Sequence, residues 1–237
     1  ITPGKVEIFD FDGAVVEQAR QVSSASAALA DKGNHRHFMA KEIYEQPETV
    51  SHTLAHYIDL AGETVKLREE LPFDFAKLSR LTITACGTAF YAGLVAKYWF
   101  ERYARLPVDV DVASEFRYRE PPLPDNGLTL VISQSGETAD TLAALRYAAK
   151  EGQHIAALVN VQESTIARLA IAAGQARGVL SPSDAHALVQ ALIELPRNIS
   201  EMLRSEGRIE EISRNLSKSK DVLYLGRGQL YPIALEG

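Results

Sequence analysis

The stretch LTLVISQSGET at residues 128–138 decides the fold class of this chain. Its first part, residues 128–132, has the apolar and β-branched composition of a buried strand. The second part changes abruptly to hydroxyl, amide and glycine residues. The following residues, 139–150, are rich in helix formers and end before Gly152. The stretch therefore predicts a strand that leads through a polar loop into the N-terminus of a helix.

The polar loop is a candidate anion site. Ser133, Gln134, Ser135 and Thr138 offer three hydroxyls and one side-chain amide. The free backbone N–H groups and the positive dipole end of the next helix would face the same anion. The loop contains no Lys or Arg, which suits the binding of a phosphate group better than phosphoryl transfer. The alternative is an ordinary Ser/Thr helix cap without a ligand.

Strands and helices alternate through the middle of the chain. We expect strands at residues 81–86, 108–113, 128–133 and 155–160, and helices at 89–103 and 139–151. This alternation predicts an α/β fold with a parallel sheet covered on both faces. In the common strand order 2-1-3-4-5, ligands bind between the first and third strands. The turn Cys86, Gly87 and Thr88 after the first strand should therefore lie beside the polar loop.

The flanking regions carry weaker signals. Residues 6–16 predict a short hairpin, and residues 39–71 predict two helices that meet at Pro47. Residues 17–34 have few large apolar side chains and indicate a linker or a lightly packed segment. Residues 183–206 predict a helix kinked at Pro196.

A faint internal repeat links two parts of the chain. Residues 223–231 echo residues 83–91 as strand, small-residue turn and aromatic helix start. We therefore expect a second α/β unit to begin near the C-terminus, and we expect the sequence at both ends to be cut from a longer polypeptide.

Composition excludes several classes of function. The chain has 237 residues, 46% of them hydrophobic, and a formal net charge of -6 with scattered basic residues. Nucleic-acid binding and attachment to anionic membranes are disfavoured. A transmembrane helix of about 20 apolar residues is not found in the sequence. The single Cys86 cannot form an internal disulfide, so we expect a cytoplasmic protein.

Three other patterns have plain explanations. Cys86 is expected to pack as a small thiol rather than act as a nucleophile. His52 and His56 have the i, i+4 spacing of metal ligands but lack a third ligand, so solvent-facing helix positions are expected. Residues 226–228 lack the full dinucleotide fingerprint. We therefore expect neither a metal nor another cofactor.

Five separated motifs resemble one family. They are KEIYEQP at 41–47, ACGT at 85–88, ASEFRYRE at 113–120, SQSGETADTLAALR at 133–146 and LGRGQLYPIALEG at 225–237. Together they resemble glucosamine-6-phosphate synthase, also called glutamine:fructose-6-phosphate aminotransferase (isomerizing). The resemblance implies a SIS-type, flavodoxin-like αβα sandwich preceded by a helical segment.

The resemblance also implies a domain order. Residues 1–34 would be the tail of the glutaminase domain with a linker, and 35–80 a helical lead-in to the isomerase domain. Residues 81–180 would form the first SIS unit, 181–216 a connecting helix and 217–237 the start of a second SIS unit.

Site residues can be carried over position by position. The phosphate of fructose 6-phosphate would contact Ser133, Gln134, Ser135 and Thr138, and the sugar would contact Cys86, Gly87 and Thr88. Ala89 stands where the family often has a serine. The family's N-terminal cysteine nucleophile, and its catalytic Lys, Glu and His beyond the position of Gly237, have no counterpart here, so no catalytic residue is assigned.

One internal position departs from the family. Arg168 is followed directly by Leu169, where the family has a few dozen more residues with a further strand. Either the full polypeptide has further residues at this point, or a real deletion strips a strand from the sheet.

The implied activity is that of an enzyme that makes glucosamine 6-phosphate from fructose 6-phosphate and glutamine-derived ammonia. The implied partners are these phosphosugars, a glutaminase domain of the same polypeptide and a second copy in a homodimer. The alternative is a non-catalytic SIS module that binds a phosphosugar within a regulator.

Overall fold

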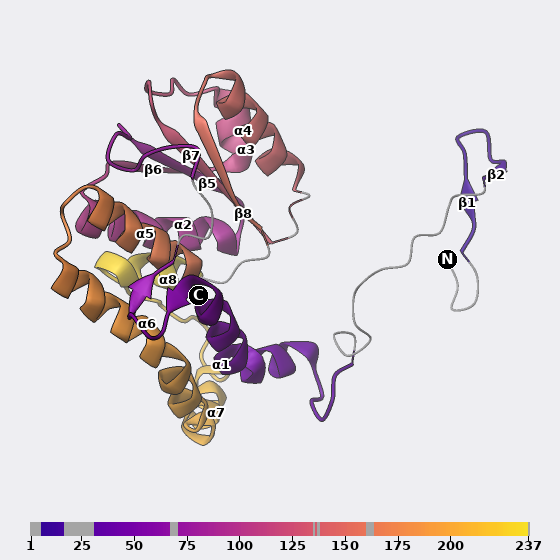
Figure 1. The fold of residues 1–237 in the computed structure, drawn as a ribbon. Helices are drawn as coiled ribbons and strands as arrows, with labels where there is room; N and C mark the ends of the chain where they lie inside the picture. Colours follow the sequence, from indigo (N-terminus) through magenta and orange to yellow (C-terminus); the bar gives the residue numbers. More distant parts are fainter. Residues whose placement is uncertain are drawn as a thin grey trace. The chain divides into compact units, whose positions relative to one another are not determined.

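The computed structural model describes residues 6–16, 31–66, 71–134, 136, 138–159 and 164–236, with backbone only for 164–169. The chain divides into two compact units, Ile1–Ile43 and Tyr44–Gly237 (Figure 1).

The first unit contains the predicted hairpin. Strand β1 (Ile8–Phe9) pairs antiparallel with β2 (Val15–Val16). In the turn between them, the Asp10 carboxylate accepts N–H bonds from Asp12 at 3.0 Å and Ala14 at 2.8 Å. Most of the predicted linker, residues 17–30, lies outside the described residues.

The second unit is built on a four-stranded parallel sheet. Its strands are β5 (Leu81–Ala85), β6 (Val108–Val112), β7 (Leu128–Ser133) and β8 (His154–Val159), in the order β6-β5-β7-β8. These are the first four strands of the predicted 2-1-3-4-5 order, which confirms the α/β fold class. In the described part of the chain, the sheet has no fifth strand beside β8.

Helices cover both faces of this sheet (Figure 1). One face carries α2 (Thr88–Trp99), its π-helical continuation η2 (Phe100–Ala104) and α5 (Ser164–Ala176). The other face carries α3 (Ala113–Arg119) and α4 (Ala139–Lys150). The main core lies on the α2 side, where fully buried side chains of the strands meet those of the helices. Its members include Leu81, Ile83, Val108, Leu130, Ala96 and Phe100.

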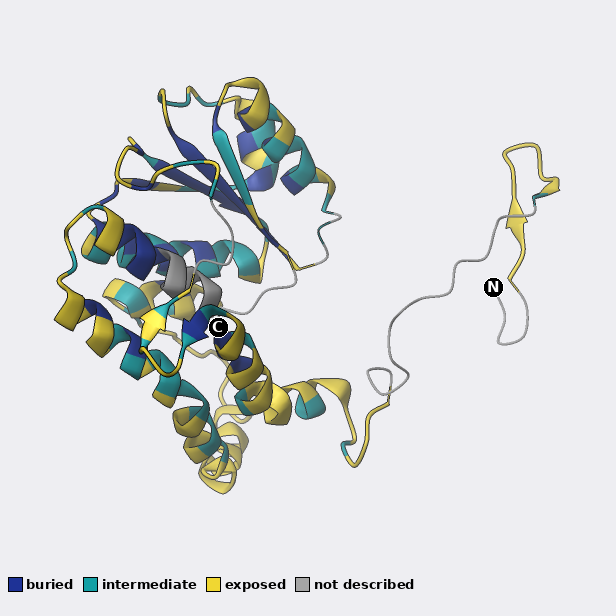
Figure 2. Ribbon diagram, in the orientation of Figure 1, coloured by how far each residue is buried: buried dark blue, intermediate teal, exposed yellow. Residues whose placement is uncertain are grey.

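A second apolar cluster joins the outer helices to one another. It contains Val50 and Leu54 from α1 (Phe38–Tyr57), Ile171 from α5, and Ala185 and Val189 from α6 (Pro182–Leu203). Figure 2 shows the burial concentrated in the sheet and its inner helix faces, whereas α7 (Glu206–Leu216) is exposed. The chain then runs through the short 3₁₀ turn η3 (Gly228–Leu230) into α8 (Tyr231–Glu236).

Two predictions about the region before the sheet were wrong. Helix α1 is one helix with Pro47 inside it, not two helices that meet at Pro47. Proline removes one N–H donor, and here burial of the face with Val50 and Leu54 carries the helix past that loss. Helical structure also ends earlier than predicted, because a small hairpin of β3 (Ile58–Asp59) and β4 (Thr64–Val65) follows.

Two further differences lie after the sheet and at its edge. Residues 221–227 form no strand, although their sequence echoes β5. The short helix α3, and α7 as a helix separate from α6, were not predicted. Helices of 7 and 11 residues carry little periodic signal of their own.

Candidate functional site

A cavity of about 270 Å³ opens at the carboxyl ends of β5 and β7. The two strands are neighbours at the centre of the sheet, so the turns that follow them face each other. The side chains around the cavity come from the end of β7, from these turns and from the first residues of α2 and α4. They are Cys86, Thr88, Ala89, Ile132, Ser133, Gln134, Thr138 and Thr141.

The loop after β7 is held by its own hydroxyl contacts. Ser133 Oγ accepts the Gly136 N–H at 3.1 Å and lies 3.2 Å from Thr138 Oγ1. Gly136 has a φ of 71°, and an added Cβ would lie 2.8 Å from Cγ1 of Val159. Glycine fits this close, left-handed position, whereas an added Cβ would force the Val159 side chain to move.

Thr138 does not behave as an ordinary helix cap. It is the N-cap residue of α4, yet its side chain makes no capping hydrogen bond to the helix. The hydroxyl contacts Ser133 instead. Thr138 is therefore no side-chain cap of α4, and it lines the cavity.

Two helix N-termini flank the cavity. Helix α2 begins at Thr88 after Gly87, whose φ is 57°, and α4 begins at Ala139. Both present backbone N–H groups and the positive ends of their dipoles. The acidic Asp140 in the first turn of α4 is paired with Arg117 at 2.8 Å, which offsets its negative charge. The arrangement favours an anion between the two helices.

The predicted site residues largely come together. Five of the seven line this cavity: Cys86, Thr88, Ser133, Gln134 and Thr138. Gly87 forms the turn between them without lining the cavity, and Ser135 lies outside the described residues. Cys86 also packs against the small cluster of Ala113, Phe116 and Ala144, as expected for a half-buried thiol.

Sequence reasoning missed two residues near the cavity. Thr141 is 3% exposed, and its hydroxyl has no partner among the described residues. Its position three residues after Thr138 was an available signal, because residues i and i+3 share a helix face. Glu236 reaches Thr88 from α8, and no local pattern could have indicated that contact.

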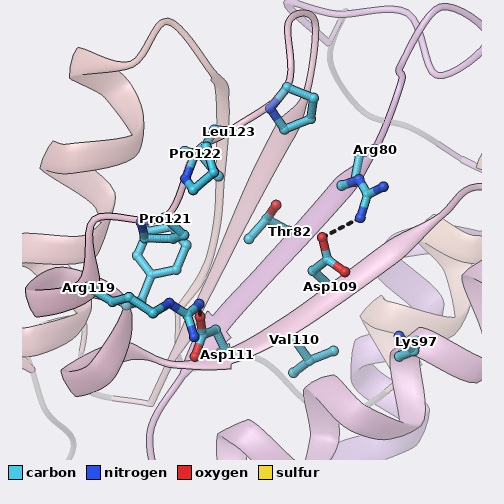
Figure 3. A pocket seen from close by; sticks show the side chains of 12 residues that line it. Arg80, Thr82, Lys97, Asp109, Val110, Asp111, Arg119, Pro121, Pro122 and Leu123 are labelled. Carbon is cyan, nitrogen blue, oxygen red and sulfur yellow. Dashed lines mark hydrogen bonds and ion pairs between the residues drawn. The ribbon is translucent and has the colours of Figure 1, made fainter.

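A larger hollow of about 610 Å³ lies elsewhere, beside β6 and α3 (Figure 3). Its cationic side chains already have partners. Arg80 pairs with Asp109 at 2.5 Å, Arg119 pairs with Asp111, and Lys97 pairs with Glu101 at 3.4 Å. Size alone therefore does not make this hollow the better anion site, since its positive charges are balanced.

The histidine pair with metal-ligand spacing lies on α1. His52 and His56 are exposed on α1, and His56 Nδ1 lies 2.8 Å from the His52 carbonyl oxygen, as solvent-facing helix residues would be. No group of three potential metal ligands occurs within the described ranges. Among the helices that the structure describes, none combines the length and apolarity that crossing a membrane requires.

Comparison with known proteins identifies the family. The SIS domain family matches residues 74–194, half of the chain. A glutamine–fructose-6-phosphate aminotransferase [isomerizing] of Bradyrhizobium diazoefficiens is 55% identical over 268 positions, covering 100% of this chain and 44% of the relative. A protein of the same name from Agrobacterium fabrum is 54% identical, with 100% and 44% coverage. The chain thus spans less than half the length of these relatives.

The alignment with the Bradyrhizobium protein is also longer than the chain. Its 268 positions exceed the chain's 237 residues by 31, so the relative has residues without a counterpart here. This agrees with the departure noted at Arg168 and Leu169 and with a sheet of four described strands.

Solved structures give the same answer. The C-terminal domain of glucosamine-fructose-6-phosphate aminotransferase from Francisella tularensis has a TM-score of 0.80 and 31% identity, over 87% of this chain and 67% of that chain. A putative sugar binding protein from Salmonella typhimurium, at 19% identity and a TM-score of 0.63 over 84% of this chain and 69% of that chain, shares the fold alone. The chain belongs to the SIS domain family and is a homologue of the SIS-containing isomerase region of glutamine–fructose-6-phosphate aminotransferase.

Proposed function

We propose that the cavity between β5 and β7 binds fructose 6-phosphate and its product, glucosamine 6-phosphate. The observation that carries this proposal is the meeting of the Ser133 and Thr138 hydroxyls with the N-termini of α2 and α4 at one cavity. Neutral donors and two dipole ends suit a phosphate group that is held but not transferred. The 55% identity with the Bradyrhizobium aminotransferase supports the choice of sugar.

Different residues of the cavity bind the phosphate and the sugar in this proposal. Ser133, Gln134 and Thr138, with Ser135, hold the phosphate, and the turn of Cys86, Gly87 and Thr88 holds the sugar. Ala89 lines the cavity with a methyl group, so a hydroxyl that the family often supplies is missing here. Loss of one such hydrogen bond weakens phosphate binding by about 1 kcal/mol if no water replaces it. The proposal includes neither a metal nor another cofactor.

The reaction proposed for the complete polypeptide is amination and isomerisation. Ammonia released from glutamine by a glutaminase domain adds at C2 of the open ketose with loss of water, and a carboxylate base moves a proton from C1 to C2. Residues of this chain receive binding roles only. A homodimer in the cytoplasm is part of the same proposal.

Isothermal titration calorimetry tests the phosphate site. Thr138→Val removes the hydroxyl at nearly constant size and should weaken fructose 6-phosphate binding by about 1.5 to 3 kcal/mol, because a bond to a charged group is lost. Thr49→Val is the matched control, since the Thr49 hydroxyl donates to the Glu45 carbonyl on α1 instead. The control should bind as tightly as the unmodified chain.

Two results would contradict the proposal. One is equal affinity for fructose and fructose 6-phosphate, and the other is an equal effect of the two threonine substitutions. A product assay on the complete polypeptide then separates the enzyme from a non-catalytic phosphosugar-binding module, because only the enzyme forms glucosamine 6-phosphate.

A further inference from the structure

The C-terminal helix brings a carboxylate to the edge of the cavity. Helix α8 packs against α2, and Thr88 Oγ1 donates a hydrogen bond of 2.6 Å to Glu236 Oε1. Thr88 is the first residue of α2 and lines the cavity. Glu236 therefore acts on a cavity residue across 148 positions of sequence.

This contact determines whether the Thr88 hydroxyl can donate a hydrogen bond to a ligand or only accept one. A threonine hydroxyl has one proton and two acceptor lone pairs. Glu236 takes the proton, so Thr88 presents only lone pairs to a ligand. A phosphate oxygen needs a donor, whereas a sugar hydroxyl can donate to those lone pairs. Thr88 thus matches the hydroxyl end of a phosphosugar and not its phosphate.

The charges near the N-termini of α2 and α4 also indicate that the phosphate binds at the α4 end. Helix α2 has no acidic residue in its first turn, and Glu236 supplies a negative charge there from α8. In α4, the corresponding Asp140 is balanced by Arg117. Within the described ranges, no Lys or Arg forms an ion pair with Glu236. Glu236 therefore offsets the positive dipole end of α2, so a phosphate is held more favourably at the α4 end than at the α2 end.

We infer that Glu236 is a positioning residue that sets the direction of the bound phosphosugar through Thr88. The phosphate lies against Ser133 and Thr138, and a sugar hydroxyl donates to Thr88. This inference rests on the proposed function, since it concerns how the same cavity takes its ligand.

Binding of two ligands by the 237-residue chain tests the inference. Fructose 6-phosphate uses both ends of the cavity, whereas inorganic phosphate uses only the α4 end. Thr88→Val should weaken fructose 6-phosphate about 3- to 10-fold and leave inorganic phosphate within about twofold, the range of one ordinary hydrogen bond.

Glu236→Gln should likewise weaken the binding of fructose 6-phosphate relative to that of inorganic phosphate. The glutamine amide can donate to Thr88 and free the threonine proton, so the sugar hydroxyl loses its acceptor. The double variant should be no worse than Thr88→Val alone, because Glu236 acts through Thr88. Glu211→Gln on α7 removes one charge away from the cavity and should leave both affinities unchanged. Thermal unfolding of each variant checks that α8 stays folded.

The outcomes separate the two proposals. A chain that binds no fructose 6-phosphate overturns both. If Thr138→Val weakens binding but Glu236→Gln leaves the ratio of the two affinities unchanged, only the role of Glu236 fails. An equal loss of both ligands, or additive effects in the double variant, would also overturn that role.

Discussion

Two regions of this chain share one sequence pattern and differ in structure. Residues 83–91 run from a strand through a glycine turn into α2, and Ile83 is fully buried between β6 and β7. Residues 223–231 repeat the pattern, but Leu223 and Leu225 are 80% and 84% exposed and form no strand. An alternating or apolar run becomes a strand only where neighbouring strands accept its backbone hydrogen bonds. The sequence pattern allows a strand, but the strand forms only beside neighbouring strands.

The largest expected difference between the two regions is how much one apolar side chain contributes to the free energy of unfolding. Ile83→Ala should lower the free energy of unfolding by about 2 to 5 kcal/mol, because it opens a cavity in the main core. Leu223→Ala, at the matching position of the repeat, should change it by less than about 0.5 kcal/mol. Urea unfolding of both variants measures the contrast. Equal losses would mean that residue 223 is buried in solution, and the comparison would break.

A glycine of the polar loop after β7 and a glycine of residues 223–231 give a smaller contrast. Gly136→Ala should cost about 3 kcal/mol, because it adds left-handed strain to a clash with Val159. Gly228 has a φ of 63° but no atom within 4 Å of an added Cβ, so Gly228→Ala should cost about 1 kcal/mol. Unfolding by urea gives both values. Gly136→Ala should also weaken fructose 6-phosphate binding, which Gly228→Ala should not.

The smallest contrast concerns single tyrosine hydroxyls. Tyr147 packs on Phe116, and its hydroxyl donates to the Pro121 carbonyl at 2.8 Å. Tyr147→Phe should cost about 1 kcal/mol, whereas Tyr224→Phe, at an exposed position of the repeat, should be neutral within about 0.5 kcal/mol. Similar values for the two would show that the Tyr147 bond contributes little.

The Tyr147 phenol also predicts a pH dependence. Burial, followed by the nearby charges of Glu151 and Glu120, raises its pKa above the ordinary value of 10.0. A raised pKa in the folded state stabilises the fold fully below pH 10.0, and this contribution is lost as pH rises through the raised pKa. Unfolding free energies measured across this range should therefore fall less steeply for Tyr147→Phe. Parallel curves for the two proteins would count against the shift.

Local patterns account for much of what could be predicted. The β7 strand, the polar loop and α4 follow from residues 128–150 alone, and the observed strand ends at Ser133 as predicted. The order of the first four strands follows from a general preference of α/β sheets, which brought Cys86 and Thr88 to the same cavity as Ser133. Pro47 shows where this approach fails, because packing of Val50 and Leu54 outweighed a local helix-breaking signal.

The sequence by itself determined the strand-loop-helix units of this protein, because strand and helix periodicity and turn glycines act over a few residues. Only the tertiary structure decided that residues 223–225 stay outside the sheet and that Glu236 meets Thr88. Both depend on which elements pack together, α8 on α2 in the second case, and contacts 148 residues apart leave no local trace. The physical reason is that backbone pairing and a buried face require partners, and the fold supplies or withholds them.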